Sequence, residues 1–123
     1  MTDVSYVRRN AERILSEVAA LAAASGVAVP RVVAVTKGGT DEEVTELLAS
    51  GLIREVGENR TDRFLARRAL AGAAGYTPLF HLIGTLQTNK VRTVIGRTDL
   101  IQSLDSARLA AEIDKRAALA GVD

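Results

Sequence analysis

The stretch Arg31-Val32-Val33-Ala34-Val35-Thr36-Lys37-Gly38-Gly39-Thr40 decides the fold of this chain. Its first half is a short apolar run rich in β-branched residues, which is typical of a parallel strand buried on both faces by helices. Pro30 marks the start of the predicted strand, 32–37, and Gly38-Gly39 marks its end. Lys37 is therefore expected at the carboxyl end of a strand, where α/β proteins place their chemistry.

The residues after this strand predict the start of a helix. Thr40-Asp41-Glu42-Glu43 has the pattern of a capping box, in which Thr40 caps the first turn and Glu43 reaches back. The three acidic residues also suit the positive end of the helix dipole. Lys37 is thus expected between the end of a strand and the amino end of a helix.

The rest of the hydrophobic pattern predicts helices and strands in alternation. Gly26, Gly51 and Gly96 are expected at helix ends or turns. Helices are expected at residues 3–25, 41–50, 60–73 and 106–120, and a polar turn at 85–90 leads into a short helix that ends near Ile95. Strands are expected at 32–37, 52–59, 79–84 and 100–105. Four strands that are each followed by a helix indicate a parallel α/β fold.

The carboxyl ends of parallel strands share one rim, so polar residues that are distant in sequence are expected to converge there. These residues are Lys37, Glu58, Asn59, Gly84 to Lys90, Ser103 and Asp105. A lysine on such a rim could bind an anion, act as a base or attack a carbonyl to form a Schiff base, and the last two need a neutral amine. The residues alone leave a structural salt bridge between Lys37 and Glu58 equally open.

Composition limits the classes of function. The 123 residues suit one domain, and 47% hydrophobic residues suffice for a core that must be largely aliphatic, since aromatic residues make up only 3%. A net charge of +1 gives no electrostatic case for nucleic acid. The absence of cysteine and the single histidine argue against thiolate and His-rich metal sites. We find no signal peptide and no apolar run of about 18 residues, so a cytoplasmic protein without membrane partners is expected.

Four motifs occur in order at fitting intervals. They are Ala34-Val35-Thr36-Lys37, Gly57-Glu58-Asn59, the string from His81 to Lys90, and Gln102-Ser103-Leu104-Asp105. Together they resemble the pyridoxal phosphate homeostasis protein family, which has the alanine-racemase-like barrel fold. The His-Leu-Ile-Gly-x-Leu-Gln-x-Asn-Lys string is the specific element. The resemblance covers residues from about 5 to 120, and Thr40 stands where the family usually has a proline.

The resemblance implies that Lys37 forms a Schiff base with pyridoxal 5′-phosphate (PLP) and that Asn59 lies beside this cofactor. It also implies a parallel (β/α) barrel, of which the chain supplies about four βα units after an N-terminal helix. A complete barrel needs roughly 250 residues. Residues 1–123 are therefore expected to be a single PLP-binding domain, either a fragment or a truncated homologue, without the family's phosphate-binding loop. A homodimer through the open barrel edges is expected as a consequence.

Other polar residues have two interpretations each. His81 is either a hydrogen-bonded core residue or a cofactor-binding residue beneath the site, and Ser103 is either structural or cofactor-binding. Arg63, Arg67 and Arg68 are expected on a solvated helix face. Asp105 or Ser106 is expected to cap the last helix, a role that we prefer for Asp105. Glu58 is expected to be structural, whereas Gln87, Asn89 and Lys90 suit a helix start and the site equally.

Three functions follow from these patterns. The first is a PLP-binding protein that acts in vitamin B6 homeostasis without established catalysis. The second is an alanine-racemase-like amino acid isomerase, which would need a second acid–base group, and neither Tyr6 nor Tyr76 is expected near the rim. The third is an interaction or structural fragment without a ligand.

Overall fold

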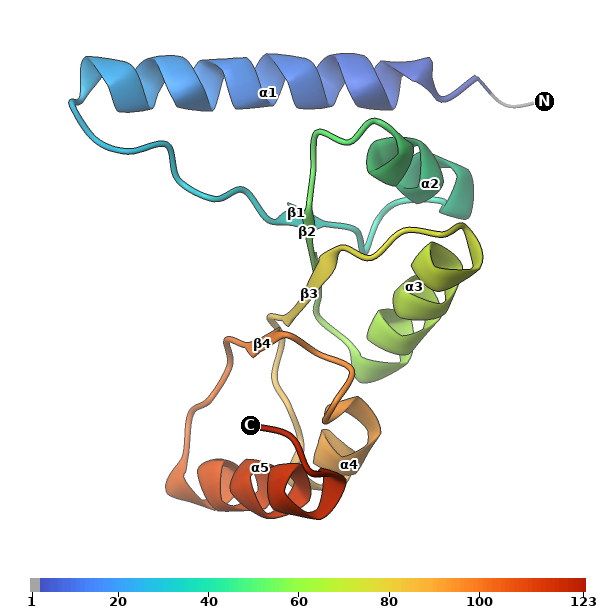
Figure 1. Cartoon of the computed structure of the whole chain (residues 1–123), viewed down its shortest axis with the longest axis vertical. Helices are drawn as coiled ribbons and strands as arrows, with labels where there is room; N and C mark the ends of the chain where they lie inside the picture. Colours follow the sequence, from blue (N-terminus) through green and yellow to red (C-terminus); the bar gives the residue numbers. More distant parts are fainter. Residues whose placement is uncertain (1–2) are drawn as a thin grey trace.

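The fold is an arc of four parallel strands with helices on its outer side (Figure 1). The computed structural model describes residues 3–123. The strands lie in the order β1-β2-β3-β4, and each pairs in parallel with the next. The predicted α/β class is confirmed, because each strand connects to its neighbour through a crossover segment that contains a helix.

The helices and strands follow the predicted order with shorter strands. The elements are α1 (Ser5–Ala24), β1 (Ala34–Val35), α2 (Asp41–Ala49), β2 (Glu55–Glu58), α3 (Thr61–Ala73), β3 (Leu79–Leu82), the 3₁₀ turn η1 (Thr88–Lys90), α4 (Val91–Val94), β4 (Leu100–Ile101) and α5 (Ala107–Ala120). The predicted six-residue strands 32–37 and 100–105 were too long. Both are edge strands with a partner on one side only, so their ladders end early.

Local signals set the ends of several helices. Thr40 caps α2 in a capping box with Glu43, as predicted. Gly26, at the end of α1, has a φ of 68°, a left-handed conformation that glycine adopts without steric cost. The preference for Asp105 as the cap of α5 was wrong, because the Ser106 hydroxyl accepts the Leu109 N–H at 3.1 Å.

The core lies between the sheet and the helices α2 to α5. Val56 and Glu58 of β2 and Phe80 and Leu82 of β3 face this side and are buried. The rings of Phe64 and Phe80 meet edge to face, with centroids 5.6 Å apart. Side chains alternate along a strand, so the intervening residues face the other side of the sheet.

No helix of residues 3–123 covers that other side, which we call the open face (Figure 1). Val35 and Leu100, which have register partners on this face, are each 49% exposed, and Leu79 is 43% exposed. The prediction that the first strand is buried on both faces was therefore wrong. Burial on the second face would need the other strands of a barrel.

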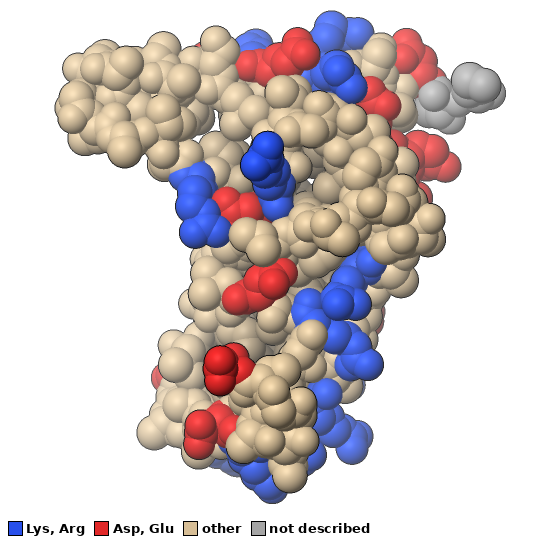
Figure 2. Space-filling model, viewed as in Figure 1, with Lys and Arg blue, Asp and Glu red and all other residues tan. Residues whose placement is uncertain are grey.

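Helix α1 packs against the body through its first half only. It contacts α2, whereas its second half extends beyond the sheet, where Leu21 is 68% exposed (Figure 1). This lobe carries no charged side chain between Val18 and Pro30 and forms an uncharged end of the face shown in Figure 2. None of the helices within residues 3–123 has the length and apolar character to cross a bilayer.

Candidate functional site

The candidate site is the rim at the carboxyl ends of the strands. Lys37 lies two residues after the end of β1, Asn59 directly follows β2, Gly84 follows β3 by two residues, and Ser103 follows β4 by two. Because the four strands are parallel and adjacent, their ends form one edge. The rim thus brings these four residues to the same edge of the sheet.

Lys37 occupies a tight turn and is exposed. The Gly39 N–H donates to the Thr36 carbonyl at 3.0 Å, which closes a β-turn with Lys37 and Gly38 in its middle. Within residues 3–123 no carboxylate oxygen lies within 4.0 Å of the Lys37 ammonium, so the alternative of a salt bridge to Glu58 is wrong. The Lys37 side chain is exposed to solvent and has no ion-pair partner among the described residues.

Asn59 is fixed through its backbone by Gly84. A Cβ atom at Gly84 would lie 2.8 Å from the Asn59 Cα, closer than real Cβ contacts allow. Only glycine therefore lets the chain after β3 pass so close to the residue after β2. The Ile83 N–H also donates to the Glu58 carbonyl at 3.0 Å, so a backbone hydrogen bond joins the two strand ends directly before this contact.

His81 lies on the open face below the rim and is 4% exposed. Its Nε2 lies 2.9 Å from Glu55 Oε1, and the Gln102 Nε2 donates to its Nδ1 at 2.8 Å. With Nδ1 accepting, the Nε2–H donates to Glu55. Both ring nitrogens are occupied, as the interpretation of His81 as a hydrogen-bonded buried residue requires.

Glu55 is the centre of this network. Arg31 Nε donates to Glu55 Oε2 at 2.8 Å, and Arg31 Nη2 donates to Oε1. The hydrogen bonds from Arg31, with a smaller contribution from His81, outweigh desolvation and lower the pKa of Glu55 to about 2. The network therefore holds a carboxylate in its ionised form on a sheet face that is otherwise largely apolar.

Ser103 has a different environment. Its hydroxyl oxygen is buried and has no hydrogen-bond partner among the described residues. Buried polar atoms usually have a partner, so an unpartnered hydroxyl on the candidate rim needs an explanation. Sequence analysis left the role of Ser103 open, and the described residues leave its buried hydroxyl without a partner.

The expectation that Arg67 lies on a solvated face with Arg63 and Arg68 was wrong. Arg67 is buried, its side chain only 6% exposed, whereas its two neighbours are exposed. Its Nη1 lies 2.7 Å from Asp41 Oδ1, and its Nη2 donates to the carbonyls of Gly39 and Thr36. The sequence carried a signal for this burial, because Arg67 falls three residues after Phe64 and four before Ala71, on the apolar stripe of α3.

Glu58 completes this buried group. Its Oε1 lies 3.6 Å from Arg67 Nε and accepts a hydrogen bond from the Thr36 hydroxyl. The carboxylate is 1% exposed and faces the helices. Removing one partner of a buried ion pair typically costs about 3–5 kcal/mol, so Glu58 and Arg67 depend on each other. The expected structural role for Glu58 agrees with this geometry.

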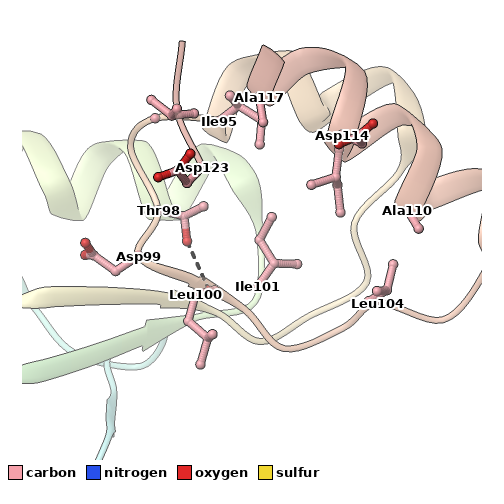
Figure 3. Close-up of a pocket in the computed structure, with 13 residues that line it drawn as sticks. Ile95, Thr98, Asp99, Leu100, Ile101, Leu104, Ala110, Asp114, Ala117 and Asp123 are labelled. Carbon is pink, nitrogen blue, oxygen red and sulfur yellow. Dashed lines mark hydrogen bonds between the residues drawn. The ribbon is translucent and has the colours of Figure 1, made fainter. Parts of the chain in front are cut away.

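Two apolar grooves lie at the free edges of the sheet. One, of about 550 Å³, lies between β4 and α5, and the other, of about 460 Å³, lies between α1 and β1. Figure 3 shows Ile101 pointing toward α5 in the first groove, while Leu100 points to the opposite side of the strand. Lys37, Asn59 and Ser103 line neither groove, although Thr36 and Gly39, the two ends of the turn that carries Lys37, line the second.

Among residues 3–123 no group of three His, Cys, Asp or Glu side chains lies close enough to hold an ion. Charges of both signs are interspersed on the face shown in Figure 2, in keeping with the net charge of +1. The rim offers the exposed primary amine of Lys37 and the hydroxyl of Ser103, which has no hydrogen-bond partner among the described residues.

Comparisons with known proteins point to one group. The chain is 42% identical over 76 residues to a pyridoxal phosphate homeostasis protein of Aquifex aeolicus, covering 62% of this chain and 32% of the relative. It is 31% identical over 97 residues to one of Helicobacter pylori, covering 77% and 42%. The resemblance to the pyridoxal phosphate homeostasis proteins is confirmed. No family model matches the chain.

Solved structures agree with these relatives. PipY of Synechococcus elongatus, in a structure with PLP bound, is 34% identical with a TM-score of 0.68, covering 82% of this chain and 48% of PipY. An unknown protein from Bifidobacterium adolescentis is 31% identical with a TM-score of 0.85, covering 98% of this chain and 54% of that protein. The chain thus spans about a third to two fifths of the pyridoxal phosphate homeostasis proteins named above, and about half of these solved chains.

Proposed function

We propose that this chain holds PLP as a Schiff base on Lys37 and serves in vitamin B6 homeostasis without catalysing a reaction. The observation that carries the proposal is the position of Lys37, an exposed and unpaired amine in a closed turn on the rim, in a chain similar to the PLP-bound PipY. In Schiff-base formation the amine adds to the aldehyde of PLP and one water molecule is lost.

The other rim residues fit this ligand. The unpartnered hydroxyl of Ser103 suits a polar ligand atom, and Asn59, held against Gly84, would contribute an amide beside the cofactor. We include His81 as a supporting residue that shapes the floor below the rim through Glu55 and Gln102. PLP would supply a carbonyl group that is masked reversibly, which suits a protein that stores or delivers the cofactor.

The test is reductive trapping. The chain contains three lysines, Lys37, Lys90 and Lys115. Incubation with PLP should produce an imine absorption band, and borohydride reduction followed by peptide mass analysis should mark Lys37. The Lys37→Ala variant should lose the band, whereas Lys90→Ala and Lys115→Ala should keep it. A label found chiefly on Lys90 or Lys115 contradicts the assignment.

The same protein preparation tests the two alternative functions, a racemase and a fragment without a ligand. A racemase needs a second acid–base group, but Tyr6 lies on α1, where its hydroxyl donates to Glu43, and Tyr76 precedes the amino end of β3. No observation favours that activity, and a racemase assay with added PLP should show none. A ligand-free fragment would give neither the absorption band nor a labelled peptide.

We also propose that two copies associate through the open face and the free edges β1 and β4. The exposed apolar residues Val35, Leu79 and Leu100 support this, as do the apolar grooves at both edges. Residues 1–123 then form a single PLP-binding domain equivalent to half a barrel. The cytoplasmic location expected from the sequence stays a prediction.

A further inference from the structure

The turn that carries Lys37 has both of its ends held by one side chain. Thr36 and Gly39 are the first and last residues of the turn, and the carbonyl of each accepts a hydrogen bond from Arg67 Nη2, the first at 3.3 Å. Lys37 and Gly38 lie between them. A side chain of α3, far away in sequence, thus fixes the backbone on both sides of Lys37.

The same guanidinium also holds the segment after the turn. Arg67 Nη1 donates to Asp41 Oδ1 at 2.7 Å, and Asp41 is the first residue of α2. The Arg67 side chain is 6% exposed, whereas that of Asp41 is 72% exposed, so the contact runs from the interior to the surface. The end of β1, the turn and the start of α2 therefore all bind the guanidinium of Arg67, which we call the anchor.

Glu58 aligns this anchor with the neighbouring strand. It accepts from the Thr36 hydroxyl and lies 3.6 Å from Arg67 Nε. Within the described residues, Glu58 Oε2 and Arg67 Nε are buried without hydrogen-bond partners. A buried pair that leaves polar atoms unpaired costs stability, so packing alone does not explain its presence. Glu58 directly precedes Asn59, which joins the anchor to a second rim residue.

We propose that Arg67 is a positioning residue that sets the location of Lys37 for reaction with an aldehyde, without touching the ligand itself. This inference rests on the proposed function of Lys37. It works through the backbone, because holding the Cα atom of Lys37 restricts where the amine at the end of a flexible side chain reaches. Arginine suits the task, since its planar group serves several acceptors at once.

The experiment compares PLP labelling of the three lysines in each variant after borohydride reduction. Arg67→Met removes all four contacts, and Lys37 labelling should fall about tenfold relative to Lys90 and Lys115, as expected for the loss of charge-assisted hydrogen bonds. Arg67→Lys keeps the charge and should recover part of the labelling. Arg63→Met is the matched control, because it makes the same change at an exposed position of α3.

Circular dichroism and urea unfolding first establish that each variant is folded. If Arg67→Met does not fold, Arg67→Lys and Asp41→Asn test the inference instead. Asp41→Asn changes only the exposed partner of Arg67. Both variants should lower Lys37 labelling by about threefold. Equal labelling of Lys37 in the folded variants and the unchanged chain overturns the inference. Failure of the unchanged chain to label Lys37 overturns the proposed function instead, so the two outcomes are distinct.

Discussion

Glu55 Oε1 lies 2.9 Å from His81 Nε2 and ties β2 to β3 on the open face. Arg31 binds the same carboxylate from the segment before β1, and Gln102 binds the far side of the His81 ring from beyond β4. One chain of polar contacts therefore runs from the segment before β1, through β2 and β3, to the segment after β4. These contacts depend on the charge of a single carboxylate.

This dependence predicts a stability change at acid pH. The pKa of Glu55 is about 2 in the folded chain against an ordinary value of 4.5, so its ionised form stabilises the fold. That contribution is fully present above the unfolded-state pKa and is lost as the pH falls from 4.5 toward 2. Urea unfolding across this window should show a declining free energy of unfolding for the unchanged chain and a flatter profile for Glu55→Gln. Glu12→Gln, at an exposed position of α1, should keep the decline, and parallel profiles for all three would contradict the assignment.

A second prediction concerns the contact between Gly84 and Asn59. A methyl group at Gly84 would push against the Asn59 backbone, with 2.8 Å between Cβ and Cα, so Gly84→Ala should lower the free energy of unfolding by about 1–3 kcal/mol. It should also weaken PLP labelling of Lys37, because the neighbouring strand end shifts.

The matched control for this substitution is Gly72→Ala in α3. A Cβ atom there meets nothing within 4 Å, and alanine favours the helix by about 1 kcal/mol, so this variant should be stabilised. Urea unfolding of the two variants should move in opposite directions. Two shifts of the same sign would contradict the close approach at Asn59.

The capping box gives a third prediction. Thr40→Ala removes the acceptor for the Glu43 N–H, which lies at 3.2 Å, and should lower the free energy of unfolding by about 1 kcal/mol. Thr40→Ser keeps a hydroxyl and should retain most of this stability in thermal unfolding. The cap lies directly after the turn of Lys37, so an alanine variant as stable as the serine variant would show that α2 starts by other means.

Sequence patterns predicted those features that depend on neighbouring residues. Thr40 with Glu43 and Gly26 are local signals, and the structure confirms them. The alternation of strands and helices also gave the rim, because parallel strands leave few choices for where their ends meet.

Features that depend on distant partners were missed. Arg67 looked like a surface residue until the turn after β1 supplied two carbonyls and Asp41 for its guanidinium. Val35 is a β-branched apolar residue typical of buried strands, yet it is 49% exposed because no described helix covers its side of the sheet. The capping role preferred for Asp105 was wrong because Asp and Ser are both good caps, and α5 begins at Ala107, which makes Ser106 the capping residue.

The fourth prediction concerns retention of PLP. The family resemblance places the phosphate-binding loop beyond the βα units present here, and each well-made charge-assisted hydrogen bond to a phosphate is worth about 1.5–3 kcal/mol. Loss of several such bonds should weaken affinity by orders of magnitude relative to PipY. The measurement is equilibrium dialysis of both proteins with PLP. Inorganic phosphate should compete with PLP more strongly for binding to PipY than for binding to this chain. Equal affinities would mean that the rim alone holds the ligand.

The last prediction follows from the open face. The exposed side chains of Val35, Leu79 and Leu100 lie on one side of a sheet that has two free edges. Covering apolar surface gains about 25 cal/mol per Å², and a stable interface buries about 1,200–2,000 Å² in total. Two copies that pair β4 of one with β1 of the other would cover both edges and both open faces at once.

Sedimentation velocity over a concentration series should therefore show a dimer that dissociates on dilution. Leu100→Glu places a charge on the open face and should shift the chain toward monomer, because burying an unpaired carboxylate is costly. Leu119→Glu introduces the same charge on α5 at a position that is 71% exposed and should leave the dimer intact. A compact monomer at all concentrations, with cooperative unfolding, would show that the four-stranded sheet is stable with its edges unpaired. Equal dissociation by both substitutions would contradict an interface confined to the open face.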